Sequence, residues 1–213
     1  MKHADASKSA LLCLDARRRA DALRALQERE FDLIVIGGGI TGAGIALDAA
    51  SRGMRVALVE KSDFAAGTSS KSTKLIHGGL RYLKNLEFAL VREVGRERAV
   101  VHALAPHLVV PEKMLLPIVR GGTFGWWATW FGLWVYDHLA GVRGEDRRIM
   151  LDRTRTLEEE PNLRPEGLRG AGLYAEYRTD DARLTIEVIK TAARQGALCL
   201  NYLSAEGFCY EGG

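Results

Sequence analysis

The feature that most constrains the fold is a glycine motif directly after an apolar segment. Residues 31–36 (Phe-Asp-Leu-Ile-Val-Ile) are nearly all apolar or β-branched, as expected for a strand buried on both faces. Gly37-x-Gly39-x-x-Gly42 follows and opens a helical pattern that ends near Gly53. The first glycine permits a tight turn, the second lets backbone approach a pyrophosphate, and the third lets the helix pack closely on the strand. The motif therefore predicts a dinucleotide site at the helix N-terminus.

A second strand and an acidic residue complete the pattern. Residues 54–59 (Met-Arg-Val-Ala-Leu-Val) form the second predicted strand, and Glu60 ends it about 20 residues past the glycines. A carboxylate there can accept hydrogen bonds from ribose hydroxyls. A glycine-rich turn that binds nothing is disfavoured by this order of elements. The motif does not separate a flavin from a nicotinamide dinucleotide, because both carry a pyrophosphate and an adenosine ribose.

The segment that follows indicates the cofactor by resemblance. It reads Gly-Thr-Ser-Ser-Lys-Ser-Thr-Lys-Leu-Ile-His-Gly-Gly-Leu-Arg-Tyr-Leu at 67–83, and further blocks stand at 105–108, 136–139 and 180–184. In order and approximate spacing these blocks resemble the FAD-dependent, quinone-reducing glycerol-3-phosphate dehydrogenases, within the family that includes D-amino-acid and sarcosine oxidases. The resemblance covers residues 31–213. It implies FAD as cofactor, oxidation of sn-glycerol 3-phosphate to dihydroxyacetone phosphate, and a membrane quinone as electron acceptor.

The glycine motif and the resemblance together predict a set of cofactor-binding residues. Hydroxyl and backbone N–H groups can satisfy phosphate and flavin polar atoms without adding charge, and paired glycines leave space beside a flat ring. A lysine can offset the negative charge of the dinucleotide. The competing interpretation of 67–79 is a serine- and glycine-rich surface loop. The predicted cofactor-binding residues are Gly37, Gly39, Gly42, Glu60, Thr68, Ser69, Ser70, Lys74, His77, Gly78 and Gly79.

The resemblance also predicts substrate and catalytic residues. It places Arg81 and Tyr82 at the substrate phosphate, where a planar guanidinium fork and a neutral hydroxyl donor are suitable partners. The competing interpretation is a pair on a helix surface. His77 is the predicted catalytic base, with a hydrogen bond to the flavin or an ordinary interior histidine as alternatives.

Composition excludes several other functions. A net charge of +3 without a run of like charge argues against a nucleic-acid partner. The three cysteines, Cys13, Cys199 and Cys209, lack metal-ligand spacing and suit a reducing compartment, so no metal is expected. No apolar signal segment begins the chain. Together with the implied quinone, this predicts a cytoplasmic protein bound peripherally to the inner face of the cell membrane; a homodimer is left open.

The predicted fold is α/β, with a Rossmann-type FAD-binding core and the start of an interleaved substrate or cap domain, truncated. Residues 1–30 are the expected helical lead-in, and 31–213 the FAD-binding domain, incomplete at its C-terminus. A short helix before Pro161 is expected within an otherwise loop-like 141–168. Asp180 is the expected N-cap of the last helix. The remaining predicted helices are 83–103 and 184–195, and the remaining predicted strands are 172–177, 197–203 and 206–210.

All four tryptophans lie in the apolar segment 124–136. The segment is shorter than the ~20 residues that span a bilayer. Tryptophan favours the bilayer interface, so one interpretation is a peripheral membrane contact or a quinone-side surface. The other is a buried helix near an active-site cap, because aromatic residues also fill cores.

The C-terminal sequence predicts that the chain is an N-terminal portion of a longer enzyme. Gly212 and Gly213 follow the strand expected at 206–210 and would begin a hairpin without a return strand. The resembled family is more than twice as long. We therefore expect the isolated chain to be inactive. The alternatives are a glycerol-3-phosphate oxidase that uses oxygen, and an inactive partial FAD-binding module.

Overall fold

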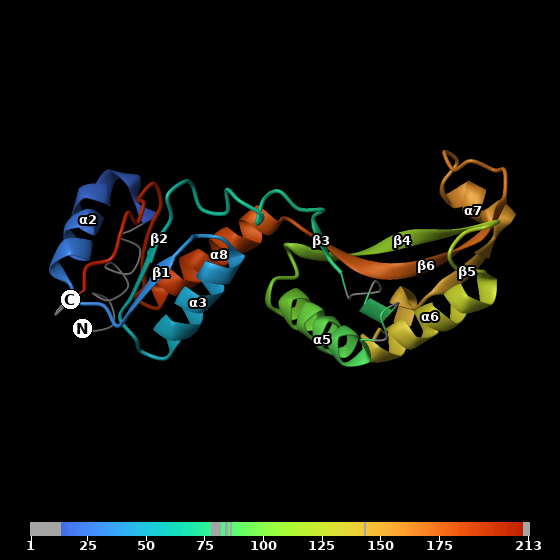
Figure 1. The fold of residues 1–213 in the computed structure, drawn as a ribbon, viewed down its shortest axis with the longest axis horizontal. Helices are drawn as coiled ribbons and strands as arrows, with labels where there is room; N and C mark the ends of the chain where they lie inside the picture. Colours follow the sequence, from blue (N-terminus) through green and yellow to red (C-terminus); the bar gives the residue numbers. More distant parts are fainter. Residues whose placement is uncertain (1–13, 78–81, 84, 86, 143, 211–213) are drawn as a thin grey trace. The chain divides into compact units, whose positions relative to one another are not determined.

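The computed structural model describes residues 14–77, 82, 83, 85, 87–142 and 144–210 (Figure 1). It divides into two compact units. The first unit consists of Met1–Thr73 and Asp180–Gly213, and the inserted unit is Lys74–Thr179. The inserted unit therefore interrupts the first unit in sequence.

The first unit contains a parallel sheet with strand order β1-β2-β7. Its strands are β1 (Leu33–Ile36), β2 (Val56–Val59) and β7 (Leu198–Leu200). Leu33 lies opposite Val56 in the first pair, and Ala57 lies opposite Leu198 in the second. Helices α3 (Ile40–Ser51) and α8 (Asp181–Arg194) share one apolar core with the sheet. Helix α2 (Arg19–Glu28), preceded by the 3₁₀ helix η2 (Ala16–Arg18), packs on a second core with β7.

Small side chains let α3 approach its neighbours closely. The buried residues of α3 are all alanines: Ala43, Ala46, Ala49 and Ala50. Buried Val35 from β1, Leu58 from β2 and Ile189 from α8 belong to the same core. Because alanine adds only a methyl group, the helix backbone lies near the strands and its N-terminus is held at their carboxyl ends.

The inserted unit is built on an antiparallel sheet. Its order is β3-β6-β4, and β5 also pairs with β6. Helices α5 and α6 lie along one side of this sheet and α7 lies on the other (Figure 1). The strands are β3 (Leu75–Ile76), β4 (Val109–Val119), β5 (Ile149–Asp152) and β6 (Leu168–Thr179). The helices are α5 (Phe88–Leu104), α6 (Trp126–Leu139), the 3₁₀ helix η3 (Gly144–Asp146) and α7 (Arg153–Glu159).

Several predicted elements match the structure. The expected helix at 184–195 is α8, and the side chain of Asp180 caps it by accepting a hydrogen bond from Arg183 N at 3.1 Å. The short helix before Pro161 is α7. The expected helix 83–103 corresponds to α5, which begins at Phe88, and the expected strand 172–177 is the central part of the longer β6.

Two predictions are wrong. Residues 206–210 form no strand, because no described segment pairs with them. The hairpin expected after them falls on 211–213, outside the described residues. The segment 141–168 is not loop-like beyond α7, since it also contains β5. In addition, β4 was not expected from the sequence.

Candidate dinucleotide site

The glycine motif forms the turn between β1 and α3. Gly37 has φ +112°, a left-handed conformation that glycine adopts without a Cβ penalty, and its N–H donates to Val59 O at 2.8 Å. Gly39 is the N-cap of α3 and has no side chain to cap the helix. N–H groups of the first turn are therefore directed away from the helix without intrahelical partners, as an anion site requires.

Added side chains would fill this turn. A Cβ on Gly42 would overlap the carbonyl oxygen of Gly37 and lie 3.3 Å from Val35 Cγ1. A Cβ on Gly39 would lie 3.1 Å from Ser69 Oγ. A side chain at position 42 would break the tight turn, and one at position 39 would crowd Ser69 and the approach to the backbone. The residues present therefore fit a pyrophosphate.

Glu60 lies directly beside the turn. Its carboxylate accepts hydrogen bonds from Gly38 N at 2.7 Å and from Ser62 N at 2.8 Å, one to each oxygen. A carboxylate oxygen has two lone pairs, so each can still accept a hydroxyl. Two backbone N–H groups thus orient the Glu60 carboxylate, which is the predicted ribose ligand. One of them, that of Gly38, belongs to the turn that would bind the cofactor.

The serine segment reaches the same place from a different part of the chain. Ser69 Oγ accepts a hydrogen bond from Ile40 N at 2.9 Å, at the start of α3. Ser70 N donates to Gly67 O at 3.0 Å, which closes a turn around Thr68. The structure therefore brings Ser69, one of the predicted hydroxyl residues, to the helix N-terminus, as a phosphate or flavin site needs.

The loop after β7 was missed in the sequence. Asn201 Nδ2 donates to Asp63 Oδ1 at 2.8 Å, and Leu203 N donates to Glu60 O at 2.8 Å. These residues complete the carboxyl edge of the sheet, where ligands of open α/β sheets bind. These residues could have been found from their position just after β7. The sequence analysis placed them inside a strand that was expected to continue to residue 203, whereas β7 ends at Leu200.

The remaining predicted residues belong to the inserted unit. Lys74 has φ +62° and its carbonyl accepts a hydrogen bond from Thr179 N at 2.9 Å. His77 follows β3, and its ring centroid lies 6.5 Å from that of Tyr82. The structure therefore brings the predicted base and one predicted phosphate ligand together. Gly78, Gly79 and Arg81 lie outside the described residues.

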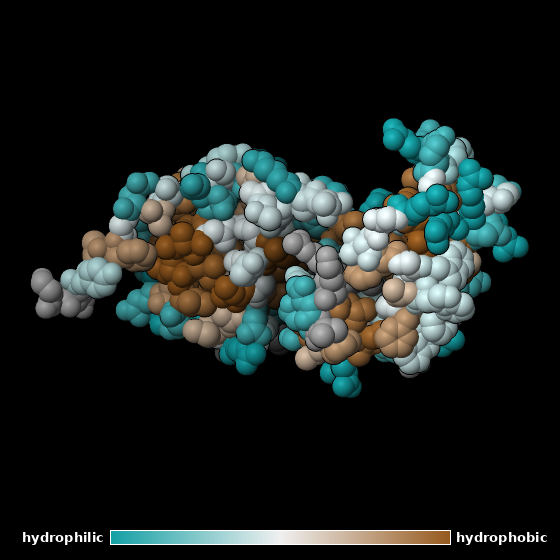
Figure 2. Space-filling view, turned by 45° about the vertical axis from the view of Figure 1, so that its right-hand side comes forward, coloured by the Kyte–Doolittle hydropathy of each residue, from teal (hydrophilic) through white to brown (hydrophobic). Residues whose placement is uncertain are grey.

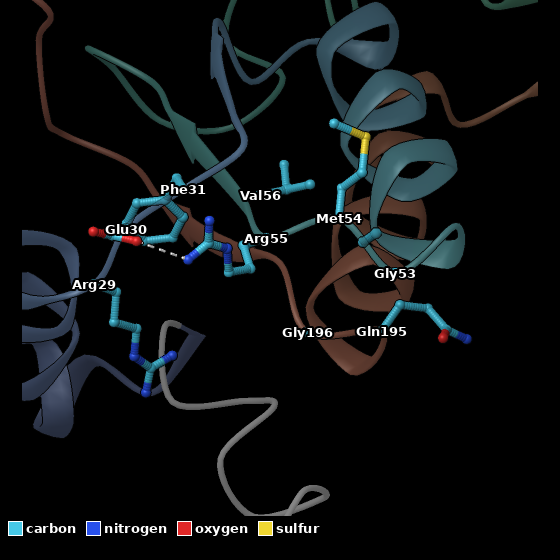
Figure 3. Close-up of a pocket in the computed structure, with 10 residues that line it drawn as sticks. Arg29, Glu30, Phe31, Gly53, Met54, Arg55, Val56, Gln195 and Gly196 are labelled. Carbon is cyan, nitrogen blue, oxygen red and sulfur yellow. Dashed lines mark hydrogen bonds and ion pairs between the residues drawn. The ribbon is translucent and has the colours of Figure 1, made fainter.

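A cavity of about 390 Å³ in the first unit lies away from the predicted site (Figure 3). Arg55 crosses it and pairs with Glu30 at 3.2 Å, while Gln195 and Gly196 line it just past the C-terminus of α8. Its lining also includes Gly53, just past the end of α3. Helix C-termini carry negative partial charge and do not favour phosphate. The candidate dinucleotide site at the β1–α3 turn lies at the opposite edge of the sheet.

The tryptophan segment is helix α6, with one buried and one exposed face. Thr129, Leu133, Tyr136 and Asp137 form the buried face. Trp127 is 78% exposed and Phe131 is 57% exposed. The segment is thus a helix with a packed face and an exposed aromatic face, and the membrane interpretation stays a prediction. No helix among the described residues is long and apolar enough to cross a membrane, and the same residues contain no His, Cys, Asp and Glu cluster suited to a metal ion.

Comparison with known proteins identifies the relatives. Residues 32–213 match the family model DAO, described as FAD dependent oxidoreductase. The chain is 56% identical over 200 residues to the aerobic glycerol-3-phosphate dehydrogenase of Staphylococcus aureus (strain USA300), covering 94% of the chain but 36% of that protein. It thus spans little more than a third of this relative.

Solved structures agree with this relationship. The glycerol-3-phosphate dehydrogenase from Bacillus halodurans, complexed with FAD, is 45% identical with a TM-score of 0.70, covering 92% of the chain and 31% of that structure. Glycine oxidase from Geobacillus kaustophilus, at 24% identity and a TM-score of 0.60 over 81% of the chain and 46% of that structure, shares the fold. These findings confirm the predicted family resemblance, α/β fold class and cofactor, FAD.

Proposed function

Because the chain belongs to the family of FAD-dependent oxidoreductases, we propose that it forms the FAD-binding part of an enzyme that oxidises sn-glycerol 3-phosphate to dihydroxyacetone phosphate. The observation that carries the proposal is the arrangement of the glycine turn, Glu60 and Ser69 around the N-terminus of α3. The 56% identity to a glycerol-3-phosphate dehydrogenase supports the choice of substrate.

The residues of the first unit have a defined part in this function. Backbone N–H groups in the first turn of α3 would hold the pyrophosphate, and Glu60 would accept from ribose hydroxyls. Ser69 already bonds the first N–H of α3 and would add a hydroxyl to the same site. When bound, FAD supplies the acceptor for the hydride that leaves substrate C2.

The residues of the inserted unit would bind and deprotonate the substrate. Arg81 and Tyr82 would hold the phosphate, which orients C2. A ring nitrogen of His77 would take the proton of the C2 hydroxyl as the hydride departs. The proximity of the His77 and Tyr82 rings supports an assignment in which one segment supplies both groups.

We further propose a membrane quinone as electron acceptor, with the protein bound peripherally to the inner face of the cell membrane. The exposed aromatic face of α6 supports this, because tryptophan partitions into the bilayer interface. Oxygen is the alternative acceptor. A glycerophosphate oxidase from Mycoplasma pneumoniae shares the fold at 19% identity and a TM-score of 0.57, which does not discriminate between the two acceptors.

The experiment compares the protein expressed from its complete reading frame with residues 1–213 alone. Flavin absorbance after gel filtration measures FAD retention, and dye reduction measures turnover of glycerol 3-phosphate, with glycerol as the control lacking phosphate. We expect stoichiometric FAD and phosphate-dependent turnover in the former, and weak flavin retention without turnover in the latter. Absence of FAD, or equal turnover of both substrates, would refute the proposal. Anaerobic turnover with a quinone, set against oxygen consumption, identifies the acceptor.

A further inference from the structure

A buried polar network joins three elements of the inserted unit. Arg98 of α5 and Glu176 of β6 are 3% and 2% exposed, and Tyr136 of α6 is fully buried. Arg98 Nη1 donates to Tyr136 Oη at 2.8 Å and to Glu176 Oε2 at 3.0 Å. Tyr136 Oη donates to Glu176 Oε1 at 2.9 Å. Each member therefore contacts the other two.

Aromatic rings surround this network. The Arg98 guanidinium lies 4.6 Å from the Tyr177 ring centroid, and the Tyr174 ring meets that of Tyr136 edge-on at 5.9 Å. Burial raises the pKa of Tyr136, and it raises the pKa of Tyr174 to about 12. Both hydroxyls are thus protonated at neutral pH, and Tyr136 remains a hydrogen-bond donor to Glu176.

Stability alone is a weak explanation for such a group. A buried ion pair loses hydration, and replacement by apolar residues of similar volume is often neutral or stabilising. Directional hydrogen bonds do, however, fix one arrangement of the elements that carry them. Here the hydrogen bonds of the network fix α5 and α6 on β6. The two helices also approach each other closely, because a Cβ on Gly95 would lie 2.5 Å from Ala140 Cα.

The junction of these helices also carries Tyr82. Its half-buried side chain packs against the cluster formed by Val91 of α5, Tyr136 of α6 and Ala140, the C-cap of α6. The network therefore fixes the same helices that provide the packing surface for Tyr82. Movement of α6 relative to α5 would displace the tyrosine and its hydroxyl.

We propose that Arg98, Tyr136 and Glu176 are positioning residues that hold Tyr82 in place to bind the substrate phosphate. The inference rests on the proposed function and adds residues that would touch neither substrate nor cofactor. Because Tyr82 would contact the phosphate and not the reacting C2, displacement of its hydroxyl is expected to weaken substrate binding and to leave the chemical step largely unchanged.

The test uses Tyr136→Phe in the flavin-loaded protein expressed from its complete reading frame. This change keeps the packed ring and removes the hydroxyl that joins Arg98 and Glu176. We expect KM for glycerol 3-phosphate and the inhibition constant of inorganic phosphate to rise together by about tenfold, with kcat and FAD content little changed. Tyr177→Phe is the matched control, because the Tyr177 hydroxyl makes no hydrogen bond to any described residue while its ring stays under Arg98.

A double-mutant cycle with Tyr82→Phe separates positioning from general loosening. If Tyr136 acts through Tyr82, Tyr136→Phe has little further effect on KM in the Tyr82→Phe background. Equal effects in both backgrounds, an effect on kcat alone, or an equal effect of Tyr177→Phe would overturn the proposal. If Tyr136→Phe does not fold, Glu176→Gln takes its place in the cycle. Lack of glycerol 3-phosphate turnover in the unmutated protein would instead refute the proposed function.

Discussion

The contact between Gly42 and the β1–α3 turn makes Gly42→Ala a direct test of the dinucleotide fold. The alanine methyl would overlap the Gly37 carbonyl oxygen and lie 3.3 Å from Val35 Cγ1. The carbonyl is backbone and cannot rotate away, so α3 must move from β1. Overpacking of this kind costs about 1–3 kcal/mol in the free energy of unfolding.

Gly44 provides the control in the same helix. Two residues further along α3 it is exposed, and a Cβ there meets no atom within 4 Å. Gly44→Ala should stabilise the protein by roughly 0.5–1 kcal/mol, because alanine favours the helix and restricts the unfolded chain. Identical substitutions in one helix are thus expected to have opposite signs, separated by about 1.5–4 kcal/mol.

Urea unfolding followed by circular dichroism measures the two free energies, and flavin absorbance after gel filtration measures FAD retention. Gly42→Ala should lower both quantities, whereas Gly44→Ala should leave FAD retention unchanged. Equal unfolding free energies for the two variants would refute the packing argument. Lower stability of Gly42→Ala with full FAD retention would show that the turn packs as described but does not set the cofactor site.

Three further outcomes are expected. Glu60→Gln should weaken FAD retention, and Glu60→Ala should weaken it more, because the amide can keep one hydrogen bond from Gly38 or Ser62 while alanine keeps neither; unchanged affinity would remove Glu60 from the site. Hydrogen bonds from Arg55 lower the pKa of Asp32 from 3.8 to about 2, so this carboxylate stabilises the fold above pH 4 and loses its effect as pH falls toward 2. Asp32→Asn should therefore flatten the acid dependence of unfolding in that range, and an unchanged profile would contradict the assignment. Arg81→Lys should raise KM for glycerol 3-phosphate with FAD content preserved, since lysine lacks the bidentate fork; an equal effect on glycerol oxidation would exclude a phosphate role.

The dinucleotide half of the site could be predicted because its determinants are local in sequence. Gly37 has a left-handed backbone conformation, Gly42 leaves no room for a Cβ beside the Gly37 carbonyl, and Glu60 follows from the length of one strand–helix–strand unit. Asp180 was likewise recognisable as a cap from its neighbours alone. What the sequence did not show is that the Glu60 carboxylate bonds Gly38, a contact between residues 22 positions apart.

The inserted sheet was harder to predict because its strands depend on distant partners. Strand β4 contains Pro111 and Pro117; among the described strands it pairs only with β6 and forms an edge, where a missing N–H is tolerated. Residues 206–210 show the reverse case: a strand was expected there, but no described segment pairs with them. The buried polar network joins residues of three separate elements, Arg98, Tyr136 and Glu176. No local sequence pattern could therefore predict it.

The crossover from β2 to β7 explains how the inserted unit can be accommodated. Parallel neighbours need a crossover connection, and α8 supplies it, but the chain builds the inserted unit between β2 and α8. The two ends of that insertion meet, since Lys74 O accepts from Thr179 N at 2.9 Å and Ser72 Oγ donates to Asp181 Oδ2. Because residues 72–74 and 179–181 lie side by side, the insertion leaves and re-enters the β2–α8 connection at nearly the same point. The connection itself therefore needs no extra length. Each unit has its own sheet, so the strands of the parallel core pair with one another. For this reason the parallel core could be predicted from the sequence despite the insertion.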